Sequence, residues 1–130
     1  MASWVDVQAR LRQEYALDVD AEDEVALTLS RREGTATREQ RVMVHRYEAW
    51  GRQMIEIRSA FGESGDYDAT SLLTDNLNLP LGAVALHGRF LVLLHKACLD
   101  DISVEAALFL LTRVTLLADV LEGRAGKDRF

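Results

Sequence analysis

The sequence of 130 residues lacks most of the features that mark specialised classes of protein. A single cysteine excludes an internal disulfide, which fits a protein of the reducing cytoplasm. The formal net charge is −6, so there is no basic excess of the kind that nucleic-acid binders carry. The longest apolar stretches are broken by arginine, lysine or aspartate well short of a membrane span. We therefore expect a protein that binds neither nucleic acid nor membranes.

The first residues contain no basic stretch followed by an apolar run, so a signal peptide is not expected and we expect a cytoplasmic protein. What the sequence does contain is ordinary for a globular chain, with 48% hydrophobic and 28% charged residues. No internal repeat or domain boundary is visible. We expect one domain over residues 1–130, with a flexible charged tail over about 124–130.

The chain begins with an amphipathic helix. Ser3 is a good N-cap, and apolar residues then recur at helical spacing. These residues are Trp4, Val7, Leu11 and Tyr15. The pattern predicts a helix over 4–16, followed by an acidic linker over 18–24. The Asp-x-Asp start of that linker resembles a calcium loop, but the glycine and the closing glutamate of that motif are absent.

Three strands are predicted next, over about 25–30, 41–49 and 52–61, with a turn over 31–38. Trp50 and Gly51 fit a two-residue hairpin loop, in which glycine supplies a positive φ. This loop predicts a register in which Ala49 faces Arg52.

In that register Val44 faces Ile57 and Val42 faces Ser59, on the face that we expect to be core. The opposite face pairs Met43 with Arg58, His45 with Glu56, and Tyr47 with Met54. Two interpretations of this mixed face stay open. It is either a half-solvated outer face, or a surface that binds a partner, because Met and Tyr are frequent on adaptable binding surfaces.

The second half of the chain predicts a short helix, a hairpin and a long helix. Asp66 or Asp68 caps the short helix, which ends before Pro80. Strands over 82–86 and 90–97 flank a turn at 87–88, and the unbroken apolar run 90–94 predicts a strand buried on both faces. The closing helix is capped at Asp100, Asp101 or Ser103 and ends near residue 122.

The closing helix has a broad apolar face that predicts contact with the sheet. This face consists of Ala107, Leu110, Leu111, Val114, Leu117, Ala118 and Leu121. Glu105, Thr112 and Asp119 mark the opposite, polar side. Phe109 and Leu116 flank that polar side and lie outside the core stripe. Their second contact is helix 1, a dimer mate or a bound peptide.

The predicted order is α-β-β-β-α-β-β-α, an α+β fold in which an antiparallel sheet is covered by the N- and C-terminal helices. This order, the hairpin over 41–59 and the segment 81–103 with its closing helix resemble the type III secretion chaperone fold. That fold is shared by chaperones of the CesT kind and by YbjN-like proteins. The resemblance covers most of the chain and includes no catalytic motif.

The resemblance implies a non-enzymatic, often dimeric protein that binds an extended segment of another protein along apolar patches of the sheet and first helix. The candidate partner-binding residues are Trp4, Leu11, Tyr47, Trp50, Met54, Phe109 and Leu116. The alternative is a structural or regulatory homodimer, in which the apolar surface serves only self-association. Neither a secretion system nor a particular partner is implied.

Residues that could carry chemistry do not form a recognisable site. His87 and His95 are kept apart by strand pairing, and His45 opposite Glu56 is interpreted as a cross-strand polar pair. Cys98 is expected to be a small buried hydrophobe. No glycine-rich phosphate loop is present, so we expect no cofactor, no metal and no enzymatic activity. Seven arginines between residues 31 and 58 form either a solvated face or a docking site for an acidic peptide.

Overall fold

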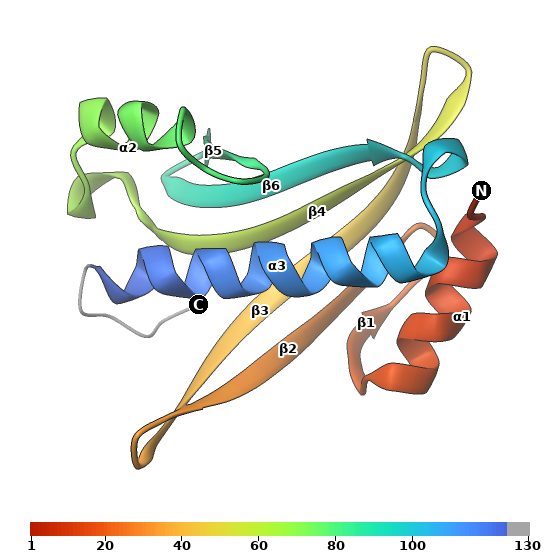
Figure 1. The fold of residues 1–130 in the computed structure, drawn as a ribbon, viewed down its shortest axis with the longest axis horizontal. Coiled ribbons are helices and arrows are strands. Elements are labelled where there is room, and N and C mark those ends of the chain that lie inside the picture. Colours follow the sequence, from red (N-terminus) through yellow and green to blue (C-terminus); the bar gives the residue numbers. More distant parts are fainter. Residues whose placement is uncertain (125–130) are drawn as a thin grey trace.

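The computed structural model describes residues 1–124 and has one six-stranded antiparallel sheet with three α-helices (Figure 1). The strand order is β1-β2-β3-β4-β6-β5. The helices are α1 (Trp4–Glu14), α2 (Ala69–Asn76) and α3 (Val104–Gly123), and the strands are β1 (Leu17–Asp20), β2 (Glu24–Glu33), β3 (Ala36–Ala49), β4 (Arg52–Glu63), β5 (Ala83–His87) and β6 (Phe90–Cys98). The predicted α+β class and the order of its helices are confirmed. The tail from residue 125 lies outside the described residues.

Local sequence signals explain where the helices begin. The side chains of Ser3, Asp68 and Ser103 each accept a hydrogen bond from the backbone N–H three residues later, which satisfies one of the free donors at a helix start. Ser103 is thus the cap chosen among the three candidates for α3. The second tight turn lies at Gly88 and Arg89, one residue later than predicted, since His87 still pairs with Phe90.

Helix α3 lies across one face of the sheet, and the core fills the space between them (Figure 1). Val44 and Ile57 are buried there as predicted, together with Leu93 of β6 and Leu111 of α3. Helix α1 adds Trp4, Val7 and Leu11 to the same core. In β6 the three residues Leu91, Val92 and Leu93 are all buried, so this strand is covered on both faces at its centre.

The linker expected over 18–24 is corrected by the structure, because residues 17–20 form the edge strand β1 and pair with β2. Leu17 and Val19 alternate with aspartates, which is the pattern of a strand with one buried face. The turn expected over 31–38 is also shorter, since β2 and β3 stay paired as far as Glu33 and Ala36. These two strands therefore form a long hairpin (Figure 1).

The predicted register of β3 and β4 is confirmed from Ala49 and Arg52 to Met43 and Arg58. The predicted pair of Val42 with Ser59 is wrong, because the ladder between these strands ends at Met43 and Arg58. Beyond that point the β2–β3 hairpin and the β4–β6 pair run apart, as Figure 1 shows. We call this divergence the fork.

Polar side chains fill the fork where backbone pairing stops. The Gln40 amide donates to Ser59 Oγ at 2.8 Å and to the Ala60 carbonyl at 2.6 Å. Ser59 Oγ in turn donates to the carbonyl of Arg41 at 2.6 Å. Gln40 and Ser59 are both buried, so these bonds replace backbone pairs that the diverging strands cannot make.

The polar side predicted for α3 is partly wrong, because Asp119 is buried, with only 3% of its surface exposed. Its carboxylate accepts hydrogen bonds from Arg31 Nε at 2.6 Å and Arg38 Nε at 2.9 Å. Arg38 also forms an ion pair with the buried Glu122 at 3.3 Å. These arginines therefore bind the β2–β3 hairpin to α3 and are not a docking site for an outside peptide.

The two edges of the sheet are protected in different ways. Asn76 at the end of α2 accepts from the N–H of Val84 at 2.6 Å and donates to its carbonyl at 3.3 Å, so its amide occupies the place of a neighbouring strand beside β5. At the other edge, β1 pairs with β2 only between Val25 and Leu27. The outer part of β2 then carries three charged residues, over 31–33.

Candidate functional site: a groove on the open face of the sheet

The sheet face turned away from α3 carries the mixed side chains that the register predicted, and we call it the open face. Met43, His45 and Tyr47 lie on β3, opposite Arg58, Glu56 and Met54 of β4. These six side chains are all partly exposed. The neighbouring strand β6 adds Phe90, Val92, Leu94 and Lys96 to the same face through its pairing with β4.

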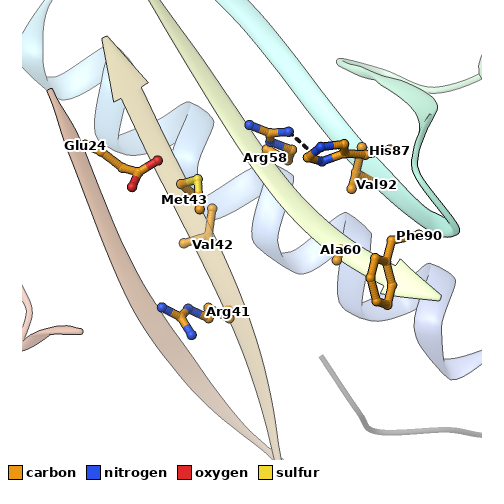
Figure 2. A pocket seen from close by; sticks show the side chains of 9 residues that line it. All are labelled: Glu24, Arg41, Val42, Met43, Arg58, Ala60, His87, Phe90 and Val92. Carbon is orange, nitrogen blue, oxygen red and sulfur yellow. Dashed lines mark hydrogen bonds between the residues drawn. The ribbon is translucent and has the colours of Figure 1, made fainter. Parts of the chain in front are cut away.

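A groove of about 550 Å³ crosses the open face at the fork. Its lining comes from five strands, β2 to β6, and consists of Glu24, Arg41, Val42, Met43, Arg58, Ala60, His87, Phe90 and Val92. Figure 2 shows the two sides of the fork bordering it, with α3 behind the sheet. Val42 is also a member of the core, so the groove reaches the core where β3 and β4 separate.

The floor of the groove is apolar, and the small side chain of Ala60 widens it. Met43, Ala60, Val92 and Phe90 contribute carbon or sulfur atoms, and Ala60 leaves room where β4 turns away from β3. A volume of this size is within the range of about 300–1,000 Å³ found for ligand pockets. A site with an apolar floor and polar groups at its border can bury apolar side chains of a partner and orient a polar group beside them.

The polar lining is held by specific contacts. Arg58 forms an ion pair with Glu56 at 3.1 Å and lies 3.0 Å from His87 Nδ1, a contact drawn in Figure 2. Since arginine only donates, Nδ1 of His87 is the acceptor. Within residues 1–124, the side chains of Arg41 and Glu24 have no hydrogen-bond or ion-pair partner. Of the two arginines in the groove, Arg58 is thus held by neighbours and Arg41 has no partner among the described residues.

An aromatic cluster lies on the open face beside the groove. The rings of His45 and Tyr47 are stacked, with their centroids 5.6 Å apart, and Lys96 lies 5.8 Å from the Tyr47 ring centre. Burial raises the pKa of the Tyr47 hydroxyl above its usual value, and the Glu56 carboxylate adds to this effect. Tyr47 and Met54 were both candidate partner-binding residues, and the structure places them together on this face.

The other candidate residues lie at separate places. Trp4 and Leu11 are buried in the core, so they present no surface to a partner in this structure. Trp50 is 94% exposed at the tip of the β3–β4 hairpin. Phe109 and Leu116 lie on the outer side of α3, where Phe109 is 55% exposed and Leu116 is half-buried.

Phe109 and Leu116 form a second apolar depression of about 440 Å³, which we call the α3 patch. Its remaining lining residues are Pro80, Leu81, Arg113, Leu117 and Val120. The guanidinium of Arg113 lies 5.1 Å from the centre of the Phe109 ring. The prediction that these two side chains lie outside the core is therefore confirmed, because α1 leaves Phe109 exposed.

The three histidines have different neighbours. His87 contacts Arg58, His45 stacks on Tyr47, and His95 Nδ1 accepts from the N–H of Gly82 at 3.1 Å. Across residues 1–124, no group of three His, Cys, Asp or Glu side chains has the arrangement of a metal site.

Cys98 is half-buried opposite Met54. In residues 1–124, no helix is long and apolar enough to cross a membrane.

Most residues of the groove were not among the candidates named from the sequence. Ala60, Phe90 and Val92 look like ordinary strand residues, and only the fork makes them a surface. One signal was available in the sequence, because the predicted register already placed Met43 and Arg58 on the mixed face.

No known protein-family model matches this chain, and a comparison with curated proteins found no match either.

Proposed function

We propose that this chain is a non-enzymatic binding module that holds an extended segment of another protein on the open face of its sheet. The observation that carries the proposal is the groove at the fork, in which an apolar floor lies beside Arg41, whose side chain has no partner within residues 1–124. Tyr47 and Met54 extend the apolar surface beyond the groove along the paired part of β3 and β4. The proposal agrees with the resemblance to type III secretion chaperones and YbjN-like proteins, which remains at the level of the fold.

An extended segment suits the shape of this surface. Side chains of an extended chain alternate between two sides, so every second residue of a partner could point toward the sheet. Addition of a partner strand to the β5 edge is less suitable, since Asn76 already occupies the backbone groups of Val84. Binding is therefore expected through side chains on the open face.

A selection from a random peptide display library tests the proposal. Met43→Glu places a charge in the groove, while Ala83→Glu adds the same charge to an exposed position on β5, outside the groove but on the same face. We expect peptides enriched on the wild-type protein to bind Ala83→Glu equally and to lose binding to Met43→Glu. Circular dichroism and thermal melting confirm that both variants are folded. If no peptide is enriched on the wild-type protein, the proposed function is contradicted.

A second candidate function is self-association through the α3 patch, as the homodimer alternative proposes. The observation in its favour is the exposure of Phe109 and of Val120, which is 48% exposed, next to a depression lined by apolar side chains. Light scattering on the wild type and on Phe109→Glu tests it. A dimer that becomes a monomer in the variant supports self-association, and a wild-type monomer rules it out.

A further inference from the structure

The charge of the groove is opposite in sign to that of the chain. The whole chain carries a net charge of −6, yet the groove lining has two guanidinium groups, those of Arg41 and Arg58, against a single carboxylate, that of Glu24. Glu24 lies at one end of the groove, as Figure 2 shows. At the other end, Arg89 lies 5.0 Å from the centre of the Phe90 ring. The middle and this end of the groove therefore attract negative charge.

Arg41 is the residue best suited to meet an incoming carboxylate. Arg58 already has Glu56 and His87 as partners, whereas the guanidinium of Arg41 has none within residues 1–124. Two other arginines of the β2–β3 hairpin, Arg31 and Arg38, are used on the core side to bind Asp119. A free guanidinium next to an apolar floor can form two parallel hydrogen bonds with one carboxylate.

From these contacts we infer that the groove selects acidic amphipathic segments, in which an aspartate or glutamate accompanies one or two large apolar side chains. The apolar side chains lie on the floor formed by Met43, Ala60 and Val92, and the carboxylate pairs with Arg41. Glu24 disfavours an acidic residue at its own end and so sets the position of the carboxylate along the groove. This inference rests on the proposed function and specifies the chemistry of its partner.

The test uses the peptide most enriched in the library selection, made synthetically, and a copy in which each Asp or Glu is replaced by the corresponding amide. Fluorescence anisotropy gives the dissociation constant of each peptide. On the wild-type protein we expect the acidic peptide to bind about tenfold more tightly than the amide copy, which is the usual size of a hydrogen-bonded charge pair. On Arg41→Gln we expect equal binding, with the affinity for the amide copy unchanged.

Two variants make the test specific. Arg32→Gln removes an exposed arginine from the same sheet face but outside the groove, so the preference for the acidic peptide should remain. Glu24→Gln removes the one carboxylate of the groove, so the acidic peptide should bind more tightly than to the wild type. The three substitutions, at Arg32, Arg41 and Glu24, each replace an exposed or partly exposed polar side chain. The melting temperatures of the variants serve as a folding control.

The outcomes separate the two proposals. If peptides bind in the groove but the amide copy binds as tightly as the acidic one, the inference is wrong and the proposed function stands. The same holds if Arg32→Gln and Arg41→Gln weaken the acidic peptide equally. If no peptide binds but octanoate does so in an Arg41-dependent manner, the occupant is a small carboxylate, and both proposals fail.

Discussion

Replacing Asp119 with alanine tests the interpretation that buried ion pairs hold the β2–β3 hairpin against α3. The carboxylate is 4% exposed and receives Arg31 at 2.6 Å and Arg38 at 2.9 Å. Removing one partner of a buried pair costs about 3–5 kcal/mol, because a charge is left without compensation. Arg31 is 40% exposed and can regain water, and Arg38 keeps Glu122, so we expect the lower end, about 3 kcal/mol.

Urea unfolding followed by circular dichroism measures this change. A loss of about 3 kcal/mol corresponds to a fall of roughly 10 °C in Tm for a domain of this size, with an unchanged dependence on urea. Asp75→Ala is the matched control, since its ion pair with Arg124 at 3.1 Å has side chains 41% and 56% exposed. The control should change the free energy of unfolding by less than about 0.5 kcal/mol. Equal losses in the two variants would refute the reasoning.

Three further predictions concern the turn, an exposed carboxylate and the sheet edge. Trp50 has a φ of 52° in the hairpin loop, a conformation that costs residues other than glycine about 1 kcal/mol, so Trp50→Asn should raise the free energy of unfolding by up to that amount in urea titrations. The pKa of Asp20 lies below 3.8, chiefly because Arg12 donates a hydrogen bond to it; its contribution to stability is therefore present at neutral pH and lost as pH falls through the folded-state pKa, and Arg12→Gln should raise that pKa in an NMR titration. Asn76→Ala should speed hydrogen exchange of the Val84 amide and cost about 1 kcal/mol, and unchanged exchange would contradict the proposed edge contact.

Features set by neighbouring residues were predictable from the sequence. The caps at Ser3, Asp68 and Ser103 act within one helical turn, and the register of β3 and β4 follows from a two-residue loop. The short strand β1 was missed because its aspartates suggested a linker, although its apolar residues alternate as those of a strand do.

Features that depend on distant residues were not predictable in this way. Asp119 was assigned to the polar side of α3, and its partners lie 88 and 81 residues earlier in the chain. The hydrophobic pattern of one helix cannot show that arginines of a hairpin will cover its polar stripe. The groove has the same origin, because Arg41 and Ala60 face it only where two strands part. Tyr47 and Met54 were found because their face follows from alternation within a single hairpin.

The Asn76 amide beside Val84 also affects how the chain behaves when it is concentrated. An uncovered strand edge can template stacking of identical chains into fibres, and here a side chain already fills the hydrogen-bonding positions of Val84 near the start of β5. The opposite margin is protected differently, since the outer part of β2 carries charged side chains, which disfavour pairing with a second copy. Both margins thereby disfavour stacking of identical chains, and the broad surface of the sheet stays available for contact.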